Sequence, residues 1–161
     1  MKYLVRLNNF LNKIMIILGG ISVLCLMTLA TGNVVLRIFQ APFGGAYEIV
    51  SFIGAIVIAF ALGYTQKMKN NIVVDILTEK FPKKLHRVLD AVNYFATMIF
   101  FGLITWQIFA YAMKVQQTGE LSETLKIIYY PFVYSVSAGF AVLTLTLLVD
   151  FLNSLLGKEE N

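Results

Sequence analysis

Long apolar stretches separated by short charged segments dominate the pattern of the 161-residue chain. Four stretches contain no Asp, Glu, Lys or Arg, namely residues 14–36, 49–66, 91–113 and 127–149. One such charge at the centre of a bilayer costs roughly 2.5–3.5 kcal/mol on insertion scales, and a hydrocarbon core about 30 Å thick needs about 20 helical residues. The pattern therefore predicts an all-α membrane protein with four transmembrane helices in a single integral-membrane domain that covers residues 1–161. The stretches lack the alternation of barrel strands.

Two further segments are amphipathic. In residues 1–13, leucines recur at three- and four-residue intervals, and charged or polar residues occupy the opposite face, as in a helix that lies in the headgroup layer. In residues 67–90, Asn71 can cap a short amphipathic helix, which Phe81 and Pro82 interrupt. We expect one interfacial helix before the first span and another between spans two and three. A surface anchor is the simpler role for both, and a specific recognition element is the alternative.

The Lys and Arg residues are distributed unevenly between the two sides of the predicted membrane. Ten lie before the first span, between the second and third spans, or after the fourth, and three lie in the other two connections. The positive-inside rule places both termini and the loop 67–90 in the cytoplasm. The net charge of +4 therefore reflects membrane topology, and no nucleic-acid partner is expected.

The composition argues against a soluble protein and against most kinds of catalytic site. Apolar residues make up 58% of the chain and charged residues 14%, against about half and about a quarter in soluble domains, so a water-soluble globule is excluded. The spans contain no acid, base or histidine that could serve a proton relay or an ion pathway, and the only histidine, His86, lies in the loop 67–90. The single Cys25 cannot form an internal disulfide. We expect no catalytic residue, no cofactor-binding residue and no metal site in this chain.

Small side chains in the second span indicate helix packing. Ser51, Ala55, Ala59 and Gly63 recur every four residues, so they line one face of the helix and let another backbone approach closely. We call this set the small-residue stripe. Gly139 in the fourth span follows Ser135 at the same spacing. The stripe packs within the four-helix unit or against a partner subunit, and both interpretations stay open at this point.

Two charges flank the turn between the first two spans. Arg37 ends the first span and Glu48 opens the second, so each complements the dipole of its own helix. As a pair they could close the hairpin. The alternative is that they dock a partner outside the membrane, because an exposed ion pair contributes little stability by itself.

The order of these features resembles a known family. Asn33 and Arg37 stand in "NVVLR" at the end of the first span, Glu48 opens the second, and Val74 and Asp75 follow it in "NNIVVDIL". With four spans and both ends inside, this arrangement resembles the DctQ-like small membrane subunit of tripartite ATP-independent periplasmic (TRAP) transporters over essentially the whole chain.

The resemblance implies a non-catalytic small subunit of a sodium-coupled importer of organic acids, such as a C4-dicarboxylate or sialic acid, in the bacterial inner membrane. It implies three partners: a large multi-spanning permease subunit that binds the substrate and the sodium ions, a periplasmic substrate-binding protein, and membrane lipids. The small subunit would brace the large subunit and help to dock the binding protein. Which acid is transported, the stoichiometry and the contacting residues stay open.

Two other classes of four-span protein have the right size. A membrane enzyme of the glutathione-using transferase type needs Arg, Glu and Asn inside its helix bundle to hold an anionic thiol cofactor. A small self-contained multidrug exporter needs a carboxylate within the membrane. The spans of this chain contain neither set of charges.

Overall fold

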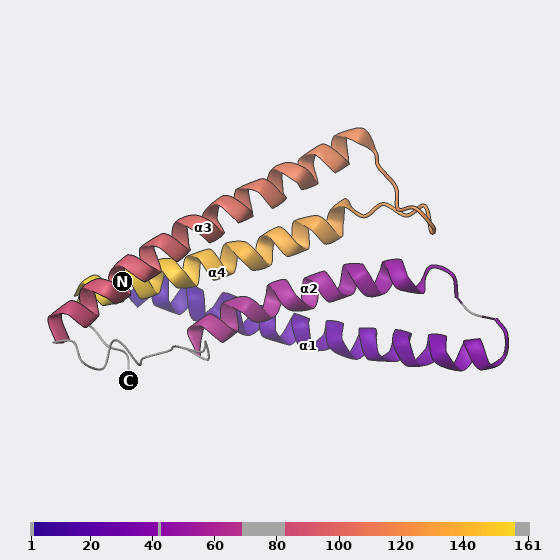
Figure 1. The fold of residues 1–161 in the computed structure, drawn as a ribbon, viewed down its shortest axis with the longest axis horizontal. Helices are drawn as coiled ribbons and strands as arrows, with labels where there is room; N and C mark the ends of the chain where they lie inside the picture. Colours follow the sequence, from indigo (N-terminus) through magenta and orange to yellow (C-terminus); the bar gives the residue numbers. More distant parts are fainter. Residues whose placement is uncertain (1, 42, 69–82, 157–161) are drawn as a thin grey trace.

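The computed structural model describes residues 2–41, 43–68 and 83–156. Within these ranges the chain forms four helices (Figure 1). They are α1 (Lys2–Ile38), α2 (Ala46–Lys67), α3 (Lys83–Thr118) and α4 (Tyr130–Leu156). Each contains a segment long and apolar enough to cross a membrane. The all-helical class with four possible spans, predicted from the runs without charge, is therefore confirmed.

Two of the helices are longer than a membrane crossing requires. At 1.5 Å per residue, α2 and α4 measure about 33 and 40 Å, close to what a hydrocarbon core and its borders need. The 37 residues of α1 and the 36 residues of α3 correspond to about 55 Å. These two helices must therefore tilt in a bilayer or extend beyond it.

The segment 1–13 differs from the separate interfacial helix that the sequence predicts. It is helical from Lys2 onward, but it continues without a break into the first span as part of α1. No proline lies in this region to end the helix. Leu7 of the predicted apolar face is half exposed, and Asn8 and Asn12, which lie between the two predicted faces, are buried. The predicted helix near Asn71 lies outside the described residues.

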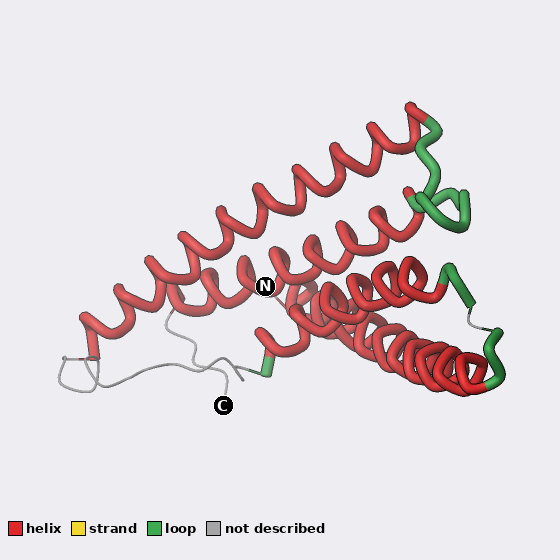
Figure 2. The backbone as a smooth tube through the Cα atoms, turned by 45° about the vertical axis from the view of Figure 1, so that its right-hand side comes forward, coloured by secondary structure: helices red, strands yellow, loops and turns green. Residues whose placement is uncertain are grey.

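The four helices follow one another in the order α3, α4, α2, α1 in an open arrangement, which we call the open layer, and the first part of α1 passes behind α4 (Figures 1 and 2). Helix α3 packs on α4, α4 on α2 and α2 on α1, and α1 also contacts α4. Within the described ranges, α3 contacts neither α1 nor α2. The fold is therefore two helical hairpins, α1/α2 and α3/α4, that meet mainly along α2 and α4, instead of a closed bundle.

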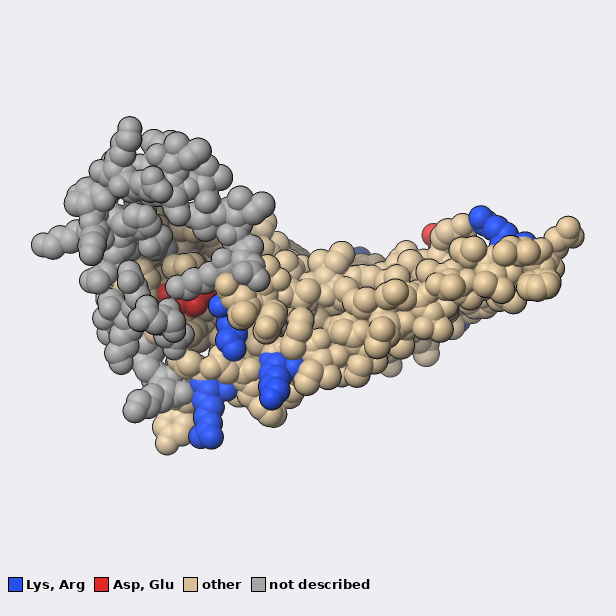
Figure 3. Space-filling view, turned by 90° about the horizontal axis from the view of Figure 1, so that it is seen from below, with Lys and Arg blue, Asp and Glu red and all other residues tan. Residues whose placement is uncertain are grey.

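The two ends of the layer are different in kind. Helix α1 begins and α4 ends at one end, which we call the terminal end, and the connections α1–α2 and α3–α4 lie at the other, which we call the loop end (Figure 1). On the face shown in Figure 3, Lys and Arg gather towards the two ends, and a broad uncharged surface lies between them. This distribution is what an uncharged bilayer core requires of a multi-pass protein.

Candidate functional site

The first functional candidate, the small-residue stripe, lies on α2 beside the seam between the two hairpins. The small-residue stripe divides there into two halves. Ala59 is 1% exposed and Gly63 is buried, whereas Ser51 and Ala55 are exposed. The half of the stripe near the terminal end is therefore internal packing, and the half near the loop end is open to lipid or to a partner.

Gly139 of α4 faces the buried half of the stripe. A Cβ atom added at Gly139 would lie 2.7 Å from the carbonyl oxygen of Ala59 and 2.9 Å from its Cβ. The backbones of α2 and α4 are thus in direct contact, as small residues permit in membrane helices. One turn further along α2, a Cβ at Gly63 would lie 2.7 Å from Oδ1 of Asn12 on α1 and 3.4 Å from a methyl of Val142 on α4. Three helices therefore meet at Gly63.

A buried polar cluster joins α1 to α4 beside this contact. The Asn12 side chain is fully buried, and its Nδ2 donates towards the Asn8 carbonyl oxygen (3.0 Å), Asn8 Oδ1 (2.9 Å) and Thr146 Oγ1 (3.1 Å). The Thr146 hydroxyl lies 2.9 Å from Asn8 Oδ1. Within the described residues, Oδ1 of Asn12 has no hydrogen-bond partner. The cluster holds the first part of α1 against α4, because the buried side chains of Asn8, Asn12 and Thr146 supply hydrogen bonds to one another.

Sequence reasoning missed this cluster. The amphipathic pattern placed Lys2, Arg6, Asn9 and Lys13 on the polar face of a surface helix and gave no role to Asn8 and Asn12. The signal that could have found it is the pair Asn8 and Asn12, which lie one helical turn apart on a different face from Arg6 and Lys13. Closer to the terminal end, Gln66 Nε2 donates to Asp150 Oδ2 at 2.9 Å, so α2 and α4 also share a polar contact.

Glu48 and Arg37 contact different partners at the loop end. The Glu48 carboxylate accepts hydrogen bonds from the backbone amides of Thr124 and Leu125 in the α3–α4 loop. The Arg37 guanidinium donates to the Tyr47 hydroxyl at 3.3 Å. The described residues include no ion pair between Arg37 and Glu48. Arg37 therefore holds α1 to the start of α2, whereas Glu48 joins the two hairpins.

Asn33 also acts at the α1–α2 turn. Its Oδ1 accepts a hydrogen bond from the backbone amide of Phe43 at 3.0 Å. The motif residues Asn33 and Arg37 thus hold the same turn. Val74 and Asp75, the other motif residues, lie outside the described part of the chain.

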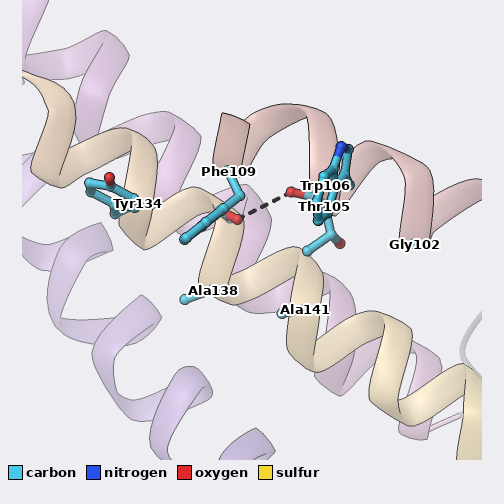
Figure 4. A pocket seen from close by; sticks show the side chains of 8 residues that line it. Gly102, Thr105, Trp106, Phe109, Tyr134, Ala138 and Ala141 are labelled. Atoms are coloured by element: carbon cyan, nitrogen blue, oxygen red, sulfur yellow. Dashed lines mark hydrogen bonds between the residues drawn. The ribbon is translucent and has the colours of Figure 1, made fainter. Parts of the chain in front are cut away.

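A groove of about 420 Å³ opens between α3 and α4 (Figure 4). Its lining is mostly apolar and aromatic, and it contains no Asp, Glu, His, Lys, Arg or Cys: Gly102, Thr105, Trp106, Phe109, Tyr134, Ser137, Ala138 and Ala141. A hydrogen bond of 3.4 Å from Ser137 Oγ to the Thr105 carbonyl oxygen crosses its floor. In the described residues, no group of three or more His, Cys, Asp or Glu could hold a metal ion. The groove can pack against an apolar surface but offers no acid or base for catalysis.

Comparison with known proteins identifies a family. The model of the DctQ component of tripartite ATP-independent periplasmic transporters matches residues 26–157, which include the last third of α1 and all of α2, α3 and α4. Neither the curated proteins nor the solved structures yield a match. The chain belongs to the DctQ family, the non-catalytic small membrane component of TRAP transporters.

Proposed function

We propose that this chain braces the large permease subunit of a sodium-coupled importer of organic acids in the bacterial inner membrane. The observation that carries the proposal is the open layer, which leaves long apolar faces on α1 and α3. The stretches 14–36, 49–66, 91–113 and 127–149 also contain no Asp, Glu, Lys, Arg or His. The substrate and the sodium ions bind the large subunit under this proposal, and this chain carries no cofactor. The glutathione-using transferase is not supported, because the matching family is a transporter component.

A conduit needs features that these helices lack. Secondary transporters bind substrate and ions near the middle of the membrane, typically at interrupted helices or at ionisable groups. Here the stretches 14–36, 49–66, 91–113 and 127–149 carry no charged residue. The described helices run without a break through the first three stretches and through residues 130–149 of the fourth. These helices suit a structural role in the membrane.

The exposed faces of the two outermost helices suit such a brace. Leu24 and Met27 on α1 are more than half exposed, as are Leu103 and Trp106 on α3. In a closed bundle such side chains would face one another. In the open layer they are free to contact lipid tails and the large subunit along the length of the membrane.

The loop end faces the periplasm in this proposal. The ten-to-three bias of Lys and Arg supports a cytoplasmic terminal end. The connections at the loop end would then lie where a periplasmic substrate-binding protein can reach them. Arg37 and Glu48 would hold this surface in place.

Reconstitution tests the proposal. The isolated chain in liposomes is expected to show no sodium-dependent uptake of C4-dicarboxylates or sialic acid, because its spans hold no group that could couple an ion to a substrate. Uptake of one of these acids is expected when the large subunit and the binding protein are added. Uptake by the isolated chain would contradict the accessory role.

The stripe offers a second measurement. Ala59→Leu is expected to lower the thermal stability of the isolated chain, because overpacking a tight contact costs about 1–3 kcal/mol. Ala55→Leu, one turn away on the same stripe and exposed, should leave that stability unchanged. If the exposed half of the stripe contacts the large subunit, Ala55→Leu should reduce the amount of large subunit that copurifies with the chain roughly fivefold to a hundredfold. Equal stability of the two variants would contradict the division of the stripe.

A further inference from the structure

The α3–α4 loop has a folded structure of its own. Leu121 and Ile128 form an antiparallel bridge, and the Ser122 amide donates to the Ile127 carbonyl oxygen at 3.0 Å. The Ile127 amide also donates to Ser122 Oγ, at 3.3 Å. The loop therefore presents the amides of Thr124 and Leu125 at the tip of a small hairpin.

These two amides face the carboxylate of Glu48 on the first turn of α2. Hydrogen bonds from two amides to one carboxylate are charge-assisted and roughly twice as strong as neutral ones. The contact is also long-range, because it joins residues separated by 76 positions in the sequence.

Apolar contacts around the Glu48 carboxylate also hold the α3–α4 loop against α2. A Cβ atom at Gly45 would overlap the Leu125 side chain, so Leu125 lies directly on the start of α2. The Phe52 ring stacks on Tyr129 and Phe132, with ring centroids 5.7 and 5.2 Å away. An open surface pocket of about 380 Å³, lined in part by Glu48 and Phe52, lies beside these contacts.

The contact between Glu48 and the α3–α4 loop lies far along α2 from the tightest packing between the two hairpins. The direct backbone contact between α2 and α4 lies at Ala59, Gly63 and Gly139, and the stripe is exposed at Ser51 and Ala55. At the loop end, α2 meets the other hairpin through Phe52 and Phe132 and through the α3–α4 loop. We propose that Glu48 is a positioning residue that latches residues 119–129 onto α2 and thereby holds the loop ends of the two hairpins together. That this latched loop forms part of the docking surface for the binding protein rests on the proposed function.

Hydrogen exchange of the full chain in lipid nanodiscs tests the latch directly. Glu48→Ala is expected to speed exchange of the amides of Thr124 and Leu125 by roughly tenfold to a hundredfold, the equivalent of losing a hydrogen bond to a charged group. Glu48→Gln keeps one acceptor oxygen and should give an intermediate increase. Glu123→Ala removes an exposed charge from the same loop and serves as the matched control. Unchanged exchange in Glu48→Ala would overturn the proposal.

Distance measurements test whether Glu48 holds the loop ends of the helical hairpins α1/α2 and α3/α4 together. Spin labels at Ile38→Cys and Gln117→Cys, in a Cys25→Ser background, report on the loop end, and labels at Met68→Cys and Leu155→Cys report on the terminal end. Glu48→Ala should broaden and lengthen the distances at the loop end and leave those at the terminal end unchanged. If Glu48→Ala does not fold, Glu48→Gln carries the test with a smaller expected change. Identical loop-end distances in a folded variant with released amides would overturn the role of Glu48 in holding the hairpins together.

Binding of the periplasmic protein separates this inference from the proposed function. In the complex with the large subunit, Glu48→Ala is expected to weaken binding of that protein at least fivefold, while copurification of the large subunit is unchanged. Faster amide exchange with unaltered binding would overturn docking at this loop but support the latch. If the assembly with the unmodified chain shows no sodium-dependent uptake, the proposed function is contradicted and the latch is not.

Discussion

Gly139→Ala is expected to destabilise the chain by about 1–3 kcal/mol, and Gly139→Leu by more. The added Cβ would lie 2.7 to 2.9 Å from the carbonyl oxygen, carbonyl carbon and Cβ of Ala59, and two of these three are backbone atoms. A flexible side chain could move aside, but backbone atoms can separate only if α2 moves away from α4. Thermal unfolding of the purified chain, followed by size-exclusion chromatography, measures the loss.

Two other glycines provide matched controls. A Cβ at Gly20 or Gly32 of α1 would meet nothing within 4 Å. Alanine at these positions should leave the stability unchanged or raise it by up to about 1 kcal/mol, because glycine is a poor helix former. If Gly139→Ala unfolds at the same temperature as Gly32→Ala, α2 and α4 do not meet as described.

Asn12→Asp is expected to cost about 3–5 kcal/mol at neutral pH, as other uncompensated buried charges do. The change is nearly isosteric, but it replaces the amide donor with an acceptor that faces Asn8 Oδ1 and Thr146 Oγ1. The Asn12 side chain is fully buried and cannot reach water. Loss of the folded chain or a strong drop in unfolding temperature would be the observed result.

Asn9→Asp is the control for this prediction. Asn9 lies in the same turns of α1 and is exposed, so the same change of charge should be tolerated. Equal effects of the two substitutions would mean that the charge of α1 matters and that the buried cluster does not.

The local features of the fold were predictable from the sequence. Whether a helix can enter a bilayer depends on the residues within that helix, so the four runs without charge located all four helices. The family was also recognisable, because its motif residues are local. Asn33 and Arg37 lie four positions apart and hold the turn that directly follows them.

The burial of the polar residues near the start of α1 was not predictable in the same way. In a membrane protein, faces that contact lipid and faces that contact other helices are both apolar, so hydrophobicity does not reveal which face is inside. Asn8 and Asn12 illustrate the difficulty, because their polarity suggests an exposed face, yet the neighbouring α4 supplies the hydroxyl of Thr146 that makes their burial possible.

The sequence by itself determined that the chain forms four membrane-spanning helices and belongs to the DctQ family. Only the tertiary structure decided which half of the small-residue stripe is buried and which group Glu48 binds. The reason is that both depend on helices distant in sequence: Gly139 closes on Ala59, and the amides of Thr124 and Leu125 reach Glu48 only after α3 has crossed and returned. Spacing along one helix defines a face, but the element that packs on that face is set by the free energy of the whole assembly of helices.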